Sequence, residues 1–546
     1  MIIMHEYPLH MVEHSAFISF VQNLQPRFSM VNFSTVQGDC VAIYLREKQN
    51  LVKLLGGISG HISITLDLWS SCQTLGYVFL TAHFIDNDWK LQRRVLNVVE
   101  VSSPDREDAL SHAIGVCIGD WGLDGKVFTL TLDKGISNDN EIPSLRGYLW
   151  IKNPLLLNGQ LLIEQCYPHV LSSIAQDGLT AIQEIINKIR DSVKYVKTSN
   201  THEEKFAELR QQLQVPSTKT LALDDQTRWD TTYLMLVAAL EMREVFCCMD
   251  TADPDYKIAI SLDEWKQVET LCAYLKLFFD GTNILTSSAY PTANAYFHDV
   301  GKIQLELTHA AMGEDSFIRD LTHPMKEKFD KFWRDCSLAL AIAVVMDPRF
   351  KMKLVEFSFS KVYGDDSDTY VKIVDEGIHE LFSEYVMQPL LLTTYPELGD
   401  EGEVKTEPSQ DSLIGGDGNG TLLSNGDGLM DFDVFISELS SSQPTKSELD
   451  QYLDESLLPR AQDFDILSWW KLNNLKYPIL SRMARDILSI PVSTVGVDAV
   501  FNTARNKLDN YRSSLRHETV EALICAKDWL QNASKEPLTA IVKMEY

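Results

Sequence analysis

Alternation of apolar and polar residues marks four strand-like segments in the first quarter of the chain. These segments are residues 62–69, 77–84, 89–101 and 126–133. The first has the clearest two-residue period, with apolar side chains at each even position from Ile62 to Leu68, which is typical of a half-buried strand. Apolar residues between Ala109 and Trp121 instead recur at helical spacing. The pattern predicts the order strand, strand, strand, helix, strand.

Helical periodicity dominates the remainder of the chain. Apolar residues follow helical spacing through most of 161–387, and the run 264–279 is one example. Near the C-terminus, residues 480–488 carry an apolar stripe at i, i+3, i+4, i+7 and i+8, and a further helix is predicted from about His517. The chain therefore combines an α/β part with all-α parts.

Composition divides the chain and limits its class. With 546 residues, 45% of them hydrophobic and 23% charged, it has the profile of a globular protein of roughly three domains. Between Glu397 and Asp465 about seventeen acidic residues face three basic ones, so about half of the net charge of −28 lies in that segment. The segment has few large apolar residues, which predicts a disordered acidic linker.

Several classes of protein are excluded by what the sequence lacks. There is no basic segment followed by an apolar run at the N-terminus, and no apolar stretch of the ~18–20 residues that span a bilayer, so we expect no secretion signal and no membrane partner. The nine cysteines are scattered and form no local zinc set, so no metal site is predicted from them. The acidic net charge argues against nonspecific DNA binding by the whole surface, although residues 471–527 are mildly basic.

Two aspartates stand at similar places on predicted strands. Asp67 lies on the polar side of the first strand, and Asp133 ends the fourth. If these strands are neighbours, both carboxylates approach one point, which suits divalent ions in phosphodiester chemistry. The alternative is that both are ordinary exposed aspartates at strand ends.

A set of motifs in fixed order resembles the hAT transposase family, and within it the plant SLEEPER group of domesticated transposases. The motifs lie at residues 65–71, 77–91, 227–233, 343–351, 477–481, 490–494 and 511–515. The resemblance implies an RNase H-like core interrupted by a large helical insertion, with a helical C-terminal dimerisation module. The corresponding divisions are 1–58 (helical N-terminal segment), 59–150 (core strands), 151–396 (insertion and remaining core), 397–462 (acidic linker) and 463–533 (dimerisation region).

The resemblance assigns catalytic roles that this sequence fills incompletely. Asp67 and Asp133 match the first two catalytic acids of the family, and Asp498 stands where the family has a glutamate. The shorter side chain of Asp498 would displace a carboxylate by about 1 Å, which can cost on the order of a hundredfold in rate. Lys134 replaces the usual asparagine beside Asp133. We therefore interpret the acid site as a remnant that is no longer active and needs no divalent metal.

Two further motifs carry alternative interpretations. Cys166 and His169 match the family's Cys-x-x-His, but two ligands cannot close a zinc site, which favours buried packing. Arg228 and Trp229 match a pair that lies near the DNA end in active relatives, so we predict DNA contacts there. Trp229 could equally belong to a helix core.

The remaining expectations concern partners. A homodimer is predicted through an aromatic and aliphatic set in the C-terminal module. Its members are Trp469, Trp470, Tyr477, Pro478, Leu480, Met483, Ile487, Leu488, Phe501, Tyr511, Arg512, Leu515, Val520, Leu523 and Trp529. Lys405 lies in an apolar-Lys-x-Glu pattern typical of attachment of a small ubiquitin-like modifier.

The family's N-terminal BED zinc finger has no counterpart in the sequence, which makes DNA binding by this chain doubtful and leaves zinc as a cofactor only of an upstream finger. Three functions remain open. The first is a non-catalytic nuclear protein that dimerises and acts in transcriptional or developmental regulation. The second is an active metal-dependent transposase or nuclease that uses all three acids. The third is a protein-interaction scaffold without DNA contact.

Overall fold

The computed structural model describes most of the chain. It covers residues 1–71, 76–101, 107–133, 136, 141–152, 155–216, 219–287, 292–388, 446–460, 464–496, 499–502 and 506–533. The described residues form one large unit, built from 1–385 together with 457 onward, and a small unit within 386–456. The large unit contains the strands and the candidate site, and the small unit contains the single described helix α17 (Glu448–Asp454).

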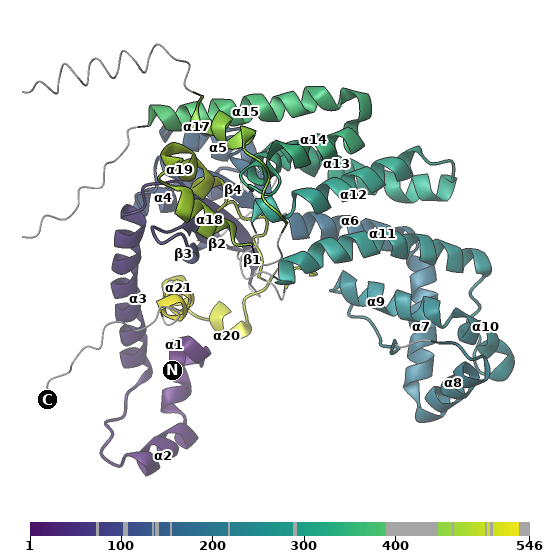
Figure 1. Ribbon diagram of the computed structural model, residues 1–546. Helices are drawn as coiled ribbons and strands as arrows, with labels where there is room; N and C mark the ends of the chain where they lie inside the picture. Colours follow the sequence, from purple (N-terminus) through teal and green to yellow (C-terminus); the bar gives the residue numbers. More distant parts are fainter. Residues whose placement is uncertain are drawn as a thin grey trace, which may run out of the picture. The chain divides into compact units, whose positions relative to one another are not determined.

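The large unit contains a five-stranded mixed sheet, and the long helices α11 (Leu262–Ser287) to α14 (Lys351–Tyr363) extend to one side of it (Figure 1). Its strands are β1 (Ile62–Ser70), β2 (Gly76–Ile85), β3 (Leu91–Val101), β4 (Val127–Leu132) and β5 (Ile163–Gln165). The spatial order is β3-β2-β1-β4-β5; the pairs β1/β2 and β2/β3 are antiparallel, whereas β1/β4 and β4/β5 are parallel. The predicted strands and their neighbouring helix α4 (Glu107–Asp120) are confirmed. The sheet is the RNase H-like core.

The expectation that β1 is half-buried was wrong, because both faces of this strand are covered. Its apolar side chains from Ile62 to Leu68 are buried, and so are the intervening Ser63, Thr65 and Asp67. The polar side chains meet other polar groups: the Ser63 hydroxyl lies 3.5 Å from that of Ser489, and Thr65 Oγ1 lies 3.2 Å from His83 Nε2. A parallel β1/β4 pair buried on both faces is the usual state in α/β folds.

Segments from both ends of the chain cover one face of the sheet. Helices α3 (Phe33–Gly56) and α21 (His517–Ala533) pack on each other, and α21 also packs on β3 (Figure 1). The Trp529 indole N–H donates to the carbonyl oxygen of Val95 at 2.7 Å, and its ring stacks on Tyr44. The C-terminal helix therefore completes the hydrophobic core of the sheet.

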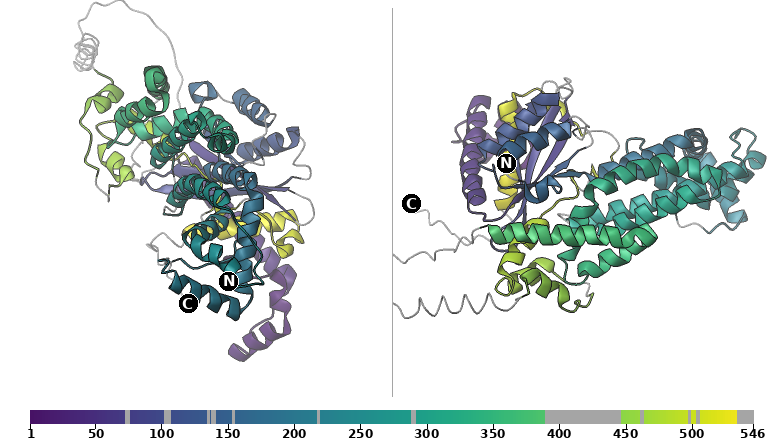
Figure 2. Two further views of the ribbon diagram at one scale, coloured as in Figure 1. Left: turned by 90° about the vertical axis from the view of Figure 1, so that its right-hand side faces the viewer. Right: turned by 90° about the horizontal axis from the view of Figure 1, so that it is seen from above.

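The helical insertion follows β5. It contains α6 (Tyr167–Ala181), α7 (Gln183–Thr198), α8 (Asn200–Gln212), α9 (Trp229–Glu241), α10 (Arg243–Ala252), α11 (Leu262–Ser287), α12 (Phe297–Met312), α13 (Ser316–Val345), α14 (Lys351–Tyr363) and α15 (Ser367–Met387). Figure 2 shows the long helices of this group side by side, and α13 packs against α6, α11, α12 and α14. No helix in the described part of the chain combines the length and apolarity needed to cross a bilayer.

Other elements lie near the N-terminus, between β4 and β5, and in the C-terminal module. These are α1 (Ile2–His5), α2 (Ser15–Leu24), α5 (Glu141–Lys152), α18 (Ile466–Asn473), α19 (Pro478–Ile487) and α20 (Asn510–Ser513). The prediction that 397–462 is a disordered linker was wrong near its C-terminal end, because Glu448–Asp454 form helix α17. Ser447 caps this helix with a complete capping box. The rest of that segment up to residue 445 lies outside the described residues, and Lys405 with it.

Candidate functional site

Asp67 lies near the end of β1 and is enclosed by protein groups. Its side chain is buried, and Oδ2 accepts a hydrogen bond of 2.6 Å from the Trp69 indole N–H. The Asn506 amide reaches the same oxygen at 3.5 Å. Burial and the neighbouring Asp133 carboxylate raise the pKa of Asp67 to about 7. A carboxyl group with this pKa carries only part of a negative charge at neutral pH.

Asp133 follows β4 directly, and the register of the sheet brings it beside Asp67. Because β1 and β4 are parallel neighbours, with Leu66 opposite Leu132, the two aspartates come one residue later on each strand. The backbone N–H of Asp133 donates to the carbonyl oxygen of Leu66, and Leu68 N–H reaches Asp133 Oδ2 at 3.3 Å. The structure therefore confirms that the strands carrying the first two predicted acids are neighbours.

A histidine pairs with the second acid. His169 Nδ1 lies 2.7 Å from Asp133 Oδ1, and both side chains are largely buried. The contact is an ion pair without the alignment of a good hydrogen bond. His169 belongs to the first turn of α6, whose start is fixed because Cys166 N–H donates to the carbonyl oxygen of Leu132. The Cys-x-x-His motif is thus buried, as expected, but it packs against the acid site.

The thiol of Cys166 supports this histidine. Thr494 donates to Cys166 Sγ through both its backbone N–H and its hydroxyl group, each at 3.3 Å. Burial opposes ionisation of the thiol, but His169 and Thr494 hold the pKa of Cys166 below its usual value. Burial likewise opposes the charged form of His169, yet Cys166 and Asp133 raise the pKa of His169 to about 11. Both contacts therefore favour the charged form of the His169 imidazole.

The third predicted acid, Asp498, lies outside the described residues, as does Lys134. The described residues on each side of Asp498 both contact α6. Thr494 binds Cys166, and Ser172 Oγ lies 3.5 Å from the carbonyl oxygen of Val500. His169 stands between these two contacts on the same helix. The described residues before and after this position therefore contact the start and the middle of α6.

Of the two residues predicted to contact DNA, Trp229 lies in the core and Arg228 is partly exposed. Trp229 is buried and donates to Ser172 Oγ at 3.1 Å, so its assignment to DNA contact was wrong and the core alternative holds. The reason is that Trp229 starts α9 and packs on Phe501. Arg228 is part-exposed, with its guanidinium 2.8 Å from Asp230 Oδ2. Its backbone also forms an antiparallel bridge with Asn502.

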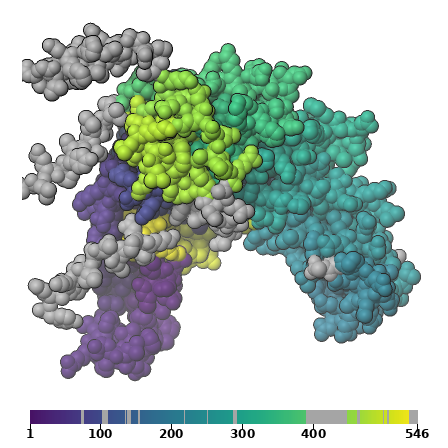
Figure 3. Space-filling view, viewed as in Figure 1, coloured from purple at the N-terminus to yellow at the C-terminus, as the bar shows by residue number. Residues whose placement is uncertain are grey.

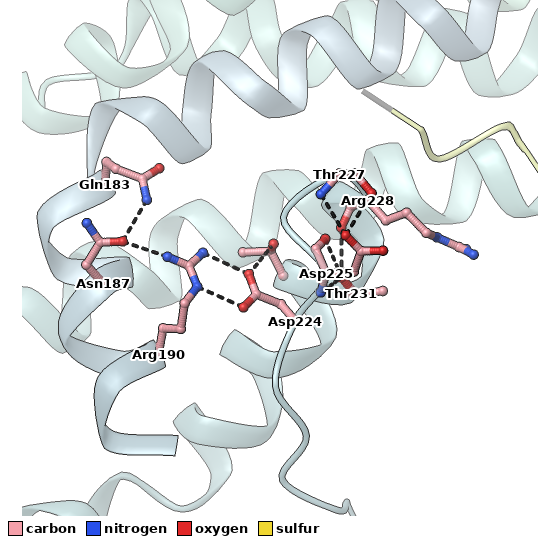
Figure 4. A network of polar contacts seen from close by, with 9 residues as sticks. Gln183, Asn187, Arg190, Asp224, Asp225, Thr227, Arg228 and Thr231 are labelled. Carbon is pink, nitrogen blue, oxygen red and sulfur yellow. Dashed lines mark hydrogen bonds and ion pairs between the residues drawn. The ribbon is translucent and has the colours of Figure 1, made fainter. Parts of the chain in front are cut away.

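A polar network fixes the turn that presents Arg228 (Figure 4). Arg190 on α7 forms a bidentate ion pair with Asp224, at 2.8 Å for each nitrogen. The next residue, Asp225, accepts from the backbone and the hydroxyl group of Thr227. Figure 4 shows the Arg228 side chain extending away from these contacts. The network holds the backbone before α9 while leaving this guanidinium at the surface.

A small cavity adjoins the acid site. It has a volume of about 130 Å³ and is lined by Leu132, Gln165, Cys166, His169, Val170, Ser173, Lys328 and Lys331. Lys328, one of these residues, pairs with Asp177. The charged groups that line the cavity are thus mainly positive.

These contacts suit a divalent cation poorly. Three of the four oxygens of Asp67 and Asp133 already have protein partners, and Asp67 Oδ1 is the exception among the described residues. No group of three or more His, Cys, Asp or Glu side chains in the described part of the chain is arranged to hold a metal ion. His169 Nδ1 lies 2.7 Å from one of these oxygens, Asp133 Oδ1. The third predicted acid lies outside the described residues, so the described groups offer a cation two carboxylates at most.

Most residues predicted for dimerisation are buried within this chain. The buried members are Trp470, Tyr477, Leu480, Met483, Ile487, Leu488, Phe501, Val520 and Trp529, whereas Trp469, Tyr511, Arg512, Leu515 and Leu523 are partly exposed and Pro478 is exposed. Trp470, for example, donates to the carbonyl oxygen of Met346 at 2.9 Å. The prediction that these residues form a free apolar face was therefore wrong, because the helical insertion and the sheet cover most of them.

Four residues of the site had no predicted role there: Trp69, His169, Thr494 and Asn506. The signal for His169 was the Cys-x-x-His motif, and Trp69 and Thr494 lie in the motifs at 65–71 and 490–494. Trp69 reaches Asp67 from two residues along the same strand. Thr494 reaches Cys166 and Asn506 reaches Asp67 from distant parts of the sequence, which periodicity does not reveal.

Comparison with known proteins identifies four family matches between residues 65 and 530. Residues 65–161 match the ZBED1 RNase-like domain, and residues 164–274 match the ZBED1 RNase-like helical domain. Residues 294–385 match the hAT-like transposase, RNase-H fold, and residues 448–530 match the hAT family C-terminal dimerisation region. The last match begins at α17, ahead of the predicted boundary at residue 463.

Several plant proteins are similar to the full length of the chain. Zinc finger BED domain-containing protein DAYSLEEPER of Arabidopsis thaliana is 53% identical over 551 residues, covering all of this chain and 75% of that protein. RICESLEEPER 2 of Oryza sativa subsp. japonica is 51% identical over 552 residues, covering all of this chain and 76% of that protein. RICESLEEPER 4 of the same species is 45% identical over 542 residues, covering 97% of this chain and 79% of that protein.

Proposed function

Because this chain belongs to the SLEEPER group of hAT transposase-derived proteins, we propose that it is a nuclear DNA-associated protein that dimerises, no longer cuts DNA, and acts in transcriptional or developmental regulation. The observation that carries the proposal is the state of the acid pair. Asp67 and Asp133 keep the positions that the RNase H-like sheet gives them, but their oxygens contact Trp69 and His169. Asp498 in place of the family's glutamate supports the same conclusion.

DNA association is supported by the relatives and by two features of the insertion. The relatives are named as zinc finger BED proteins, so a finger of this type would bring the zinc that the described residues of this chain do not hold. Arg228 offers a part-exposed guanidinium at a fixed turn, and Lys328 and Lys331 line the cavity beside His169. Cations at fixed backbone positions are what phosphate contacts require.

The dimer contact requires a surface other than the buried stripe of α19. Within the matched region 448–530, the large apolar side chains that are more than a third exposed among the described residues are Leu457, Leu472 and Leu475. Leu472, in the last turn of α18, is 82% exposed, and Leu475, in the turn between α18 and α19, is 93% exposed. Figure 3 shows the light-green segment that contains these two helices on the visible face. We assign this turn to the contact with a second copy of the chain, because exposed apolar side chains within a dimerisation region are costly unless they are covered.

Binding and cutting of DNA by the full chain test the proposal together. We expect the wild type to retain duplex DNA in a salt-dependent way and to leave supercoiled plasmid intact with Mg²⁺ or Mn²⁺. A double variant, Arg228→Ala with Lys331→Ala, should weaken retention, and Asp320→Ala on the exposed side of α13 is the matched control. Retention that does not change with salt would favour a scaffold without DNA contact. Nicking that disappears in Asp67→Asn would establish an active nuclease instead.

A further inference from the structure

We propose that helix α2 and the loop after it form a contact with a second copy of the chain. None of the ten residues of α2 is buried, although apolar residues predominate in it. Its Phe20 is 60% exposed and its Leu24 is 70% exposed, and Phe28 and Met30 in the following loop are exposed as well. These four side chains are called the α2 surface below.

Within this chain, α2 packs on a short 3-10 helix, η1 (Leu9–Glu13). Phe17, Ile18 and Val21 are half-buried, whereas the α2 surface is not covered. A ten-residue helix has little stability of its own in water and depends on burying an apolar face. Clustered apolar side chains at the surface are typical of contact sites, so the α2 surface requires an apolar partner.

The α2 surface is attached to the dimerisation region of the chain. The backbone N–H of Leu9 in η1 donates to the hydroxyl group of Tyr511 at 2.6 Å. Glu6, which follows α1, pairs with Lys527 on α21 at 2.7 Å and with Arg512 on α20, and α1 packs on α21 (Figure 1). All three C-terminal residues belong to the matched hAT dimerisation region. This continuity favours a second copy of the chain as the partner.

The charge of this segment also suits a contact between identical surfaces. In an isologous contact the same side chains face each other across a two-fold axis, so a net charge there would repel itself. Residues 15–26 contain no Asp, Glu, Lys or Arg. A nucleic-acid backbone would instead require several cations, and Arg27 is the single Lys or Arg between residues 15 and 30. An apolar, uncharged patch therefore fits a second copy better than DNA.

This contact goes beyond the proposed function, because it adds a surface to the one at the turn between α18 and α19. Each self-complementary surface joins one pair of chains, so a chain with two such surfaces links dimers into larger assemblies. We expect the chain to form a dimer through the dimerisation region and a larger assembly, at the least a tetramer, through the α2 surface at higher concentration.

Analytical ultracentrifugation of the full chain between about 1 and 100 μM tests the contact. The wild type should pass from a dimer to a larger assembly over this range. Phe20→Asp combined with Leu24→Asp should weaken the second step by roughly 30-fold or more and leave the dimer dissociation constant unchanged. The matched control is Leu262→Asp combined with Met312→Asp, at exposed positions of the helical insertion, which should behave like the wild type.

Hydrogen exchange followed by mass spectrometry locates the contact. In the wild type, the amides of residues 15–30 should exchange more slowly at the high concentration than at the low one. In the Phe20/Leu24 double variant they should exchange equally fast at both. The wild-type comparison also decides the question if far-UV circular dichroism shows that the double variant is unfolded.

The outcomes separate this inference from the proposed function. A larger assembly that persists in the Phe20/Leu24 double variant overturns the α2 contact and leaves the proposed function intact. Exchange of residues 15–30 that does not change with concentration has the same consequence. If this double variant dissociates to monomers while Leu472→Asp with Leu475→Asp has no effect, the α2 contact stands and the turn between α18 and α19 is removed from the proposed function.

Discussion

The indole nitrogen of Trp229 lies 3.1 Å from the hydroxyl oxygen of Ser172, and this contact joins the start of α9 to α6. Ser172 in turn lies 3.5 Å from the carbonyl oxygen of Val500. One buried contact chain therefore links the helix that carries His169 to the segment that follows Asp498. This arrangement makes Trp229 a structural residue of the site and leaves Arg228, its neighbour, as the residue that can meet DNA.

Substitution of these two neighbours should separate stability from binding. Trp229→Ala removes a fully buried indole and a hydrogen bond, and it should lower the free energy of unfolding by about 3–5 kcal/mol. Arg228→Ala removes a part-exposed ion pair and should cost no more than ~1 kcal/mol. Urea denaturation followed by tryptophan-independent circular dichroism measures both. Equal losses in the two variants would contradict the division of roles.

The fold was predictable because it depends on local periodicity and strand order. The alternating pattern from Ile62 to Leu68 gave β1, and the family resemblance correctly implied the RNase H-like core. The burial of Ser63 and Thr65 was not visible in that pattern, because their partners Ser489 and His83 come from other segments. A period of two indicates two different faces but does not say whether the polar face is covered.

Of the candidate site, only the two neighbouring aspartates could be predicted from the sequence. Asp67 and Asp133 follow from strand ends, whereas the pairing of His169 with Asp133 depends on where α6 begins relative to β4. The apolar stripe of α19 shows the corresponding limit for surfaces. Its spacing predicted a buried face correctly, but an amphipathic pattern does not distinguish burial against the same chain from burial against a second copy.

The turn between α18 and α19 should control dimerisation. Leu472→Asp combined with Leu475→Asp places charges where the second copy is expected, and it should weaken the dimer by roughly 30-fold or more. Sedimentation equilibrium of the full chain gives the dissociation constant. Leu262→Asp, at a 75% exposed leucine on α11 outside the dimerisation region, should leave that constant unchanged. A dimer that resists both aspartates would place the contact elsewhere.

The buried stripe of α19 should behave differently from this turn. Met483 is fully buried within the chain, so Met483→Ala should lower the free energy of unfolding by about 2–5 kcal/mol through loss of packing. The dimer dissociation constant should change little as long as the chain remains folded. Dissociation at unchanged stability would instead restore α19 as the dimer face.

A buried carboxylate should hold α15, α19 and the start of β1 together. Asp486 Oδ2 accepts from the Tyr385 hydroxyl at 2.6 Å and lies 2.7 Å from His61 Nδ1. Tyr385→Phe removes one charge-assisted hydrogen bond and should cost about 1.5–3 kcal/mol. Asp486→Ala strands both partners and should cost more, roughly 3–5 kcal/mol. Chemical denaturation measures these values, with Asp320→Ala as an exposed control expected within about 0.5 kcal/mol of the wild type.

The stability of the folded chain should depend on pH through Asp67. Burial and Asp133 raise the pKa of this carboxyl group from 3.8 to about 7, so the folded chain holds a proton that the unfolded chain releases between these two values. Stability contributed by the protonated form is therefore present at low pH and is lost as the pH rises towards 7. The full loss is at most roughly 4 kcal/mol, from 1.36 kcal/mol per pKa unit.

Asp67→Asn removes this titration while keeping an oxygen that can accept from Trp69. We expect the variant to lose less stability than the wild type between pH 5 and pH 8, so the difference between the two free energies of unfolding should grow with pH across that window. Urea denaturation at several pH values measures the difference, and Asp320→Asn controls for a general effect of removing a carboxylate. If the free energies of unfolding of Asp67→Asn and the wild type change in parallel with pH, Asp67 is ionised throughout this range. The acid pair would then carry more negative charge than His169 alone can balance.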